Sequence, residues 1–347
     1  MSATSLIQRG WRHTPGKWRV LLSLAFSELL WKGFDSAYGI VDSWVSLARE
    51  FAGEQAASLT NAILRKLCRV HEKTPMLPVD FLPVPFLSQW QNANGILDDA
   101  VKWLMSPQKV FWHAYDKDAG LAEMPGRPLP WEGGVALVLE EGRTPQSFMA
   151  ECSDRGFIQN LTQARICKRI HDKLGGRLLD YCSAPGGKAW QLARLSSGTL
   201  SADLYDINPR RRARLGASPA LGIFRGLELL ADGDLKPGSY PDLLIDVPCS
   251  NSGVLSKSPE AMRHCWGGPD AFAAVQEEIL AKAVQMVAPS GRIHYTTCSI
   301  SPAENENRLN SFAQTNGFRM TNQEAFSPNA TGAHGGYWGL LEKDENS

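Results

Sequence analysis

The sequence shows no closely spaced cysteine pair and no long apolar run, and no leader segment is evident in it. Its seven cysteines in 347 residues include no Cys-x-x-Cys pair, so neither a zinc ribbon nor a disulfide scaffold is expected. The longest early apolar stretch, residues 20–31, contains Ser23, Ser27 and Glu28, and it is shorter than the roughly twenty residues that span a bilayer. The first ten residues lack the apolar core of a signal peptide. We therefore expect a cytoplasmic protein with reduced thiols and no membrane contact.

Net charge is absent as well, because 36 Lys and Arg balance 36 Asp and Glu. This balance excludes a uniformly basic coat protein for nucleic acid, but it allows a local basic surface. Residues 116–154 are acidic, whereas residues 160–216 carry eleven basic and four acidic side chains. Those basic residues are Arg165, Lys168, Arg169, Lys173, Arg177, Lys188, Arg194, Arg210, Arg211, Arg212 and Arg214. A hydrophobic fraction of 43% is ordinary for a globular chain, and the length suggests about two domains.

Apolar residues at helical spacing predict three helices within residues 17–72. The three expected apolar faces are Val20, Leu21, Leu24, Leu29 and Leu30, then Val41, Trp44, Val45 and Leu47, then Leu59, Ile63, Leu64 and Leu67. The last helix carries Arg65, Lys66 and Arg69 with no acid between residues 61 and 69. This basic segment is either a solvated helix face or a face that contacts phosphates.

Four prolines within residues 74–90 predict a linker or domain boundary, because they cannot all lie inside one helix. Beyond it, residues 108–115 and 135–140 resemble short strands, separated by Pro125, Pro128 and Pro130. We expect a small α+β subdomain here. The predicted division of the chain is therefore 1–73, 74–154 and 155–347.

Strands and helices alternate from about residue 155 onward. Expected strands are 177–181, 200–205, a third one closing at Ile223, 241–247 and 291–297, and expected helices are 188–195 and 271–287. Such alternation is typical of an α/β fold with a parallel, doubly wound sheet.

The first expected strand of this region leads into a glycine-rich turn at Gly186 and Gly187. Nucleotide-like cofactors bind at such turns, because glycine lets the backbone approach the ligand closely. Asp206 follows Gly186 by twenty residues, which is the offset at which an acid meets ribose hydroxyls. Since no Gly-x-Gly-x-x-Gly pattern is present, a compact adenosyl cofactor fits better than a dinucleotide.

Two cysteines follow expected strands at the edge where ligands bind. Asp246 ends the apolar strand 241–247 and is followed by Cys249, and Cys298 directly follows the strand 291–297. Asp246 either caps the following turn or binds a substrate. A lone buried cysteine is usually structural, but two thiols at the carboxyl ends of strands in one sheet can face a single crevice.

These segments resemble the RNA (cytosine-5) methyltransferases of the Sun type, which include bacterial 16S rRNA enzymes and use S-adenosylmethionine. That family carries Asp-x-Cys-Ala-Ala-Pro-Gly-Gly-Lys, Asp-Ala-Pro-Cys-Ser-x-x-Gly and Tyr-x-Thr-Cys-Ser, with Glu-Asn-Glu shortly after. The matching segments here are Asp180-Tyr-Cys-Ser-Ala-Pro-Gly-Gly-Lys188, Asp246-Val-Pro-Cys-Ser-Asn-Ser-Gly253, Tyr295-Thr-Thr-Cys-Ser299 and Glu304-Asn-Glu306. Residues 18–70 resemble a shortened form of the family's antitermination-factor-like helical domain.

The resemblance implies a Rossmann-like methyltransferase sheet at 155–347, preceded by a helical RNA-binding domain and the small α+β subdomain. It also implies that Cys298 is the nucleophile, that Cys249 assists product release, that Asp246 holds the cytosine edge and that Lys188 lies near the base. The implied cofactor-binding residues are Cys182, Ser183, Ala184, Pro185, Gly186, Gly187, Lys188, Asp206, Arg211, Glu228 and Asp246. The implied partner is RNA, most directly ribosomal RNA, bound by a monomer.

Three other functions remain open at this point. One is a non-catalytic RNA-binding or ribosome-assembly factor that kept the fold, although the intact Cys249, Cys298, Asp246 and Lys188 argue against it. The second is a tRNA cytosine-5 methyltransferase. The third is a dinucleotide-dependent oxidoreductase, which the missing glycine pattern disfavours. Trp266 and Trp338 are candidates for stacking on bases.

Overall fold

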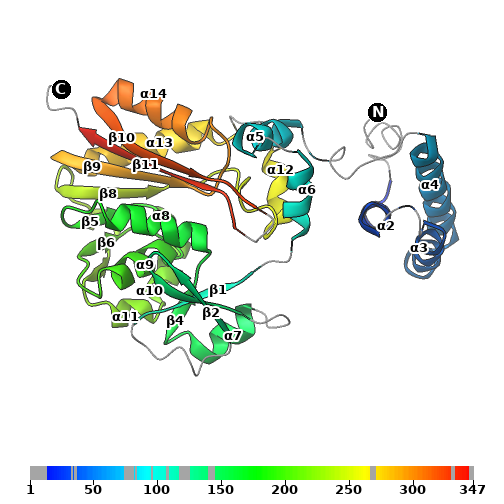
Figure 1. Ribbon diagram of the computed structural model, residues 1–347, viewed down its shortest axis with the longest axis horizontal. Helices are drawn as coiled ribbons and strands as arrows, with labels where there is room; N and C mark the ends of the chain where they lie inside the picture. Colours follow the sequence, from blue (N-terminus) through cyan, green and yellow to red (C-terminus); the bar gives the residue numbers. More distant parts are fainter. Residues whose placement is uncertain are drawn as a thin grey trace. The chain divides into compact units, whose positions relative to one another are not determined.

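The computed structural model describes residues 14–32, 34, 37–73, 82, 84–94, 97–106, 109–116, 126–139, 145–265, 271–329 and 333–343 (Figure 1). Contacts between residues divide the chain into two compact units, Met1–Leu82 and Pro83–Ser347. The proline-rich residues 74–80 and Trp266 lie outside the described residues. Within the described residues, no helix is both long and apolar enough to cross a membrane.

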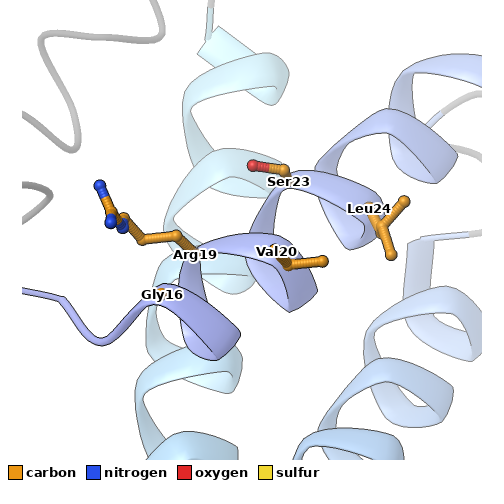
Figure 2. Close-up of a pocket in the computed structure, with 5 residues that line it drawn as sticks. All are labelled: Gly16, Arg19, Val20, Ser23 and Leu24. Carbon is orange, nitrogen blue, oxygen red and sulfur yellow. The ribbon is translucent and has the colours of Figure 1, made fainter.

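The described part of the first unit consists of α2 (Gly16–Lys32), α3 (Ala37–Ala52) and α4 (Glu54–Lys73), which confirms the predicted helices. Their shared core contains Ala25, Leu29, Ile40, Val41, Leu64 and Leu67. The predicted face of α2 is right for Leu29, which is buried, but wrong for Val20 and Leu24, which are 59% and 51% exposed. α2 is apolar on several sides, so spacing alone does not select the side that packs. Figure 2 shows Val20 and Leu24 lining a surface hollow along α2, together with Gly16, Arg19 and Ser23.

The second unit begins with α5 (Val84–Asn94) and α6 (Leu97–Met105), followed by a small antiparallel sheet. This sheet has the order β2-β3-β1-β4, formed by β1 (Phe111–Ala114), β2 (Arg127–Trp131), β3 (Gly134–Val138) and β4 (Gly156–Ile158), with α7 (Pro145–Cys152) before β4. Strands within 108–115 and 135–140 are therefore confirmed. The prediction missed β2, because Pro128 and Pro130 were interpreted as separators. β2 tolerates them because it is an edge strand, where a missing N–H breaks no ladder bond on the outer side.

The larger sheet has seven strands in the described residues, in the order β10-β11-β9-β8-β5-β6-β7. β5 (Leu178–Asp180), β6 (Ala202–Leu204), β7 (Leu227–Leu229), β8 (Tyr240–Asp246) and β9 (Val287–Thr297) run parallel. β11 (Gly336–Lys343) pairs antiparallel with β9, and β10 (Phe318–Phe326) pairs antiparallel with β11. The predicted α/β fold with a parallel sheet is confirmed.

Helices cover both faces of the larger sheet (Figure 1). On one face pack α8 (Leu161–His171), α9 (Gly187–Leu195) and α10 (Pro209–Gly216), and on the other α13 (Ala273–Ala283) and α14 (Glu306–Asn316). The strand predicted to close at Ile223 is wrong, since this residue ends the short helix α11 (Ala220–Ile223) and the third strand is β7. Pro219 directly precedes α11, and proline is well suited to a helix start.

A buried arginine joins the two sheets of the second unit. Arg194, in the last turn of α9, is 2% exposed. Its guanidinium donates to the carbonyl oxygens of Ala114 at 2.8 Å, Gly133 at 3.1 Å and Val135 at 3.3 Å. These carbonyls belong to β1, β3 and the turn before β3, so α9 of the larger sheet is fixed to the small sheet.

Candidate active site

The turn after β5 is held close to the neighbouring strand. Gly186 has φ +103°, a backbone conformation that favours glycine, and a Cβ atom there would lie 2.3 Å from the Trp190 ring. The Ser183 amide donates to the Tyr205 carbonyl oxygen at 2.9 Å, and the Gly186 amide donates to the Ser183 carbonyl oxygen at 2.7 Å. The predicted glycine turn, residues 182–187, therefore lies at the carboxyl end of the parallel strands.

The buried Asp180 carboxylate and Ser183 hydroxyl lie beside this turn. Neither makes a hydrogen bond of regular geometry within the described residues, although the Ser183 hydroxyl is near enough to Asp180 to oppose the rise of its pKa. Asp180 is 1% exposed. Burial, together with the nearby charge of Asp246, raises the pKa of Asp180 to about 7. Buried oxygens at a strand end that lack a regular hydrogen-bond partner are suited to bind a ligand with an ammonium group or hydroxyls. S-adenosylmethionine carries both.

The pKa of Asp180 predicts a pH-dependent stability. Because the folded protein binds the Asp180 proton between the unfolded value of 3.8 and about 7, its free energy of unfolding falls as pH rises through this window. At about 1.4 kcal/mol per pKa unit, Asp180→Asn should raise the free energy of unfolding of the unliganded protein at pH 8 by up to about 4 kcal/mol and leave it unchanged near pH 4. Urea denaturation at both pH values measures the difference. The exposed Asp154→Asn is the control, and an equal gain at both pH values would contradict the prediction.

Acidic residues follow the next two strands. The buried Asp206 accepts from the Ala184 amide at 3.3 Å and from the Asn208 amide at 2.9 Å, so it anchors the glycine turn. Arg212 donates to the Asp206 carbonyl oxygen at 2.9 Å and to Asp232 at 2.6 Å. Arg211, which was predicted to bind cofactor, lies exposed on α10.

Glu228, also predicted to bind cofactor, lies within β7 and pairs with Arg177 at 2.8 Å. Arg177 precedes β5, at the opposite end of the strand from the glycine turn. The acid that follows β7 at the carboxyl end is instead Asp232, which accepts from the Tyr205 hydroxyl at 3.1 Å. Sequence reasoning missed Asp232 because it placed the end of the third strand at Ile223.

The two predicted thiols meet at the carboxyl ends of β8 and β9. The Sγ atoms of Cys249 and Cys298 are 3.3 Å apart. Cys298 donates to Asn251 Oδ1 at 2.8 Å, and Cys249 Sγ lies 3.6 Å from the same oxygen. Cys249 is buried, whereas Cys298 is partly exposed. The hydrogen bond with Cys298, together with burial, raises the pKa of Cys249 well above its usual value.

Lys188 and Asp246 form an ion pair near the thiols. Lys188 Nζ lies 2.7 Å from Asp246 Oδ2, and Thr296 donates to Asp246 Oδ1 at 2.9 Å. Burial alone would lower the pKa of Lys188, but the charge of Asp246 and the nearby thiols of Cys167 and Cys298 raise it above its ordinary value. The ammonium is therefore kept charged in a mostly buried place.

A buried glutamate ties the two thiol-bearing loops together. Glu304 is 1% exposed and accepts from the Ser250 amide at 2.8 Å, the Ser250 hydroxyl at 2.6 Å and the Ser299 hydroxyl at 2.5 Å. Gln276 of α13 also donates to Glu304, at 3.4 Å. Since Ser250 follows Cys249 and Ser299 follows Cys298, this network fixes the separation of the thiols. The Glu304-Asn-Glu306 motif was noted in the sequence, but nothing in its spacing indicated this contact.

Trp338 was a candidate for stacking on a base, but the structure places it in the core. It is 3% exposed in β11, and its ring stacks on His294 of β9 at a centroid distance of 6.4 Å. The strand pairing of Trp338 with Thr296 turns the indole into the core, where its bulk fills space against α8 and α9.

Residues 170–337 match the family model described as 16S rRNA methyltransferase RsmB/F. These residues belong to the RsmB/F family. The match contains the glycine turn, both thiols, the Lys188–Asp246 pair and Glu304. S-adenosylmethionine is the cofactor of this RsmB/F domain.

Curated relatives of the RsmB/F domain also match the preceding residues. The ribosomal RNA small subunit methyltransferase B of Xylella fastidiosa (strain Temecula1) is 26% identical over 79% of this chain and 67% of its own length. The ribosomal RNA small subunit methyltransferase B of Thermus thermophilus is 28% identical over 83% of this chain and 68% of its own length. A putative methyltransferase of Mycobacterium tuberculosis is 36% identical over 52% of this chain and 36% of its own. The chain therefore spans about two thirds of the first relatives and about a third of the last.

Solved structures share the fold of the RsmB/F domain. A methyltransferase homolog protein from Pyrococcus horikoshii has a TM-score of 0.55 at 17% identity, covering 76% of this chain and 100% of that chain. NSun6 from Pyrococcus horikoshii, whose structure was determined with SFG, has a TM-score of 0.58 at 14% identity and covers 76% of this chain and 98% of its own.

Proposed function

We propose that this protein is an RNA (cytosine-5) methyltransferase that acts on ribosomal RNA of the small subunit, as a cytoplasmic monomer. The observation that carries the proposal is the pair of thiols, 3.3 Å apart, at the strand ends that also carry the Lys188–Asp246 pair. Cytosine carbon 5 is a poor nucleophile, and a thiol that adds to carbon 6 removes this difficulty. A second thiol is then useful for breaking the intermediate down.

Ser183, the glycine turn, Asp206 and Asp232 are the residues we propose to hold the cofactor, with Asp180 meeting its ammonium group. When bound, S-adenosylmethionine supplies an electrophilic methyl group. The proposed contacts follow from the orphaned oxygens beside the turn and from the acids that follow β6 and β7. Glu228 is not part of this proposal, because it pairs with Arg177. Arg211 remains a proposed cofactor contact, since its charge acts on Cys182 of the glycine turn.

Cys298 is the proposed nucleophile. It is the more exposed thiol of the pair, whereas Cys249 is buried and its pKa is raised well above its usual value. Its thiolate forms a bond to cytosine carbon 6, and carbon 5 becomes enamine-like and accepts the methyl group. Asp246, held by Lys188 and Thr296, accepts a hydrogen bond from the amino group of the base. The base must leave its stack to reach these groups, which favours loops and partly unfolded RNA.

Cys249 is proposed to take the carbon 5 proton. Once Cys298 is bonded to carbon 6, its hydrogen bond no longer raises the pKa of Cys249. Cys249 then loses its own proton to solvent, and its thiolate takes the carbon 5 proton. Loss of the proton restores the ring double bond and expels the Cys298 thiolate, so the enzyme is regenerated. The thiol separation set by Glu304 allows both groups to reach adjacent carbons of one ring.

The test is bisulfite sequencing of RNA from a strain that lacks the gene, paired with methylation of that RNA by the purified protein and radiolabelled cofactor. We expect one site in the small-subunit ribosomal RNA to lack 5-methylcytosine in this strain and to be methylated by the purified protein in vitro. Loss at a tRNA site would replace the proposed substrate, and no lost 5-methylcytosine anywhere would favour an assembly factor without catalytic activity.

The helices of residues 1–73 are proposed to contact RNA through α4. Arg65, Lys66 and Arg69 are exposed on this helix, and Arg65 is fixed by Asn61 at 2.7 Å. Replacing all three with alanine should weaken RNA binding several-fold and lower the slope of log affinity against log salt by about 2. Filter binding between 50 and 200 mM salt measures the slope. Lys282→Ala on α13 is the matched control, and an unchanged slope for the triple variant would show that α4 presents only a solvated face.

A further inference from the structure

We propose that Asn251 is an additional catalytic residue, whose carboxamide hydrogen-bonds to Cys298 Sγ in both the thiol and the thiolate state. This inference rests on the proposed role of Cys298. Asn251 Oδ1 lies 2.8 Å from Cys298 Sγ and 3.6 Å from Cys249 Sγ, so a single amide faces both reacting sulfur atoms. Asn251 falls on a variable position of the motif Asp-Ala-Pro-Cys-Ser-x-x-Gly, so the motif assigns it no role.

The backbone holds Asn251 in place for this contact. Its φ is +59°, in the left-handed region that asparagine tolerates better than most residues other than glycine. The Val254 amide donates to the Asn251 carbonyl oxygen at 3.0 Å, and the Gly253 amide donates to the Cys298 carbonyl oxygen at 3.0 Å. Ser252 Oγ accepts from the Ile300 amide at 3.1 Å. On the other side of Asn251, Ser250 Oγ lies 3.3 Å from Ser299 Oγ, so the loop after β8 is bonded on both sides of Asn251 to the loop that carries Cys298.

A carboxamide suits a sulfur atom that changes its protonation state. The neutral thiol is a donor, and Oδ1 accepts from it. The thiolate is only an acceptor, and a half-turn of the amide about the Cβ–Cγ bond presents Nδ2–H to it instead. The proton leaves the thiol for solvent, and Asn251 neither gains nor loses one. An aspartate at this position would accept from the thiol but repel the thiolate.

Other charged and titratable groups surround the thiol and must be kept in the test. The charged groups beside the thiol pair are Lys188 of α9, Asp246 of β8 and Glu304 of the loop after β9, and Cys249 is the neighbouring thiol. None of these is altered in Asn251→Gly, which removes the carboxamide and accepts the positive φ without strain. Asn251→Asp keeps the side-chain shape and adds a charge. Asn251→Ala is avoided, because alanine adopts this positive φ less readily than asparagine does.

The experiment follows the alkylation of Cys298 by iodoacetamide as a function of pH, with mass spectrometry of the peptide that contains it. A hydrogen bond to a charged group is strong enough that its loss should slow alkylation at pH 7.5 about tenfold. We therefore expect the pH midpoint in Asn251→Gly to rise by about one unit, with a larger rise in Asn251→Asp. kcat for methyl transfer should fall by a similar factor, while the KM for RNA stays within twofold. Asn329→Gly, in an exposed loop, is the control for the substitution itself.

The pH midpoint of Cys298 alkylation in Asn251→Gly is the measurement that tests the proposal. A midpoint equal to that of the unaltered protein overturns it, even if Asn251→Asp shifts or activity falls, because added charge or a disturbed loop would explain those effects. Thermal unfolding confirms that each variant is folded. Alkylation needs neither RNA nor cofactor, so its result is independent of the proposed function. If the pH midpoint shifts but the unaltered protein transfers no methyl group, the methyltransferase function is refuted and the hydrogen bond between Asn251 and Cys298 is supported.

Discussion

Cys298→Ala is expected to reduce methyl transfer by at least about a thousandfold, because it removes the thiol that we propose bonds to carbon 6. Cys249→Ala is expected to behave differently: the carbon–sulfur bond forms, but the carbon 5 proton is not removed, and the protein stays attached to RNA. Denaturing gel electrophoresis of protein incubated with RNA and S-adenosylmethionine shows the adduct as a band of lower mobility. A methylation assay on the same samples gives the loss of turnover.

The pair of variants also discriminates between the two thiols. An adduct with Cys298→Ala, and none with Cys249→Ala, would reverse their roles. Cys68→Ala is the matched control, since this partly exposed thiol lies in α4 of the other unit and should leave turnover unchanged. Because the thiols are 3.3 Å apart, each variant should be assayed under reducing conditions, so that oxidation of the unaltered protein does not mimic the loss.

Arg194→Ala is expected to lower the free energy of unfolding of the second unit by about 3–5 kcal/mol. The change removes a 2%-exposed side chain and leaves three carbonyl oxygens without the donor they have. Chemical denaturation followed by tryptophan fluorescence measures the loss. Arg194→Lys restores the charge but cannot reach all three carbonyls, so we expect an intermediate value.

The control for Arg194 is Arg210→Ala, on the exposed surface of α10, which should change the free energy of unfolding by less than about 0.5 kcal/mol. Equal values for Arg194→Ala and Arg210→Ala would mean that water replaces the lost donors and that the two sheets are held by apolar contacts alone. A large loss that is confined to residues 109–139 in hydrogen exchange would instead show that only the small sheet detaches.

Sequence patterns predicted the parallel sheet, because strands alternate with helices and because β5 and β8 are largely apolar runs that end in Asp180 and Asp246. The same reasoning located Cys249 and Cys298, since side chains that follow neighbouring parallel strands meet at one edge. It did not locate Asn251 or Glu304 as partners of the thiol loops. Their contacts join residues about 50 positions apart, and no local spacing encodes which polar side chain faces which.

Two errors in the secondary-structure prediction, the buried face of α2 and the missed strand β2, also have physical causes. An evenly apolar helix such as α2 offers no period from which to read its buried face. A strand that contains prolines looks like a turn until its neighbours are known, and β2 is recognisable only from its pairing with β3.

The prolines of β2 have a consequence for how the molecule behaves at high concentration. Alternate residues of a strand direct their N–H positions to opposite sides, so Pro128 and Pro130 fall on the same side. β3 occupies the other side, and the outward edge of β2 therefore lacks two of the donors that a strand from another molecule would need. Open edges of this kind are where sheets of separate molecules pair and precipitate. The β2 edge of the small sheet is thus protected from edge-to-edge aggregation by its backbone chemistry, without any charged side chain being needed for it.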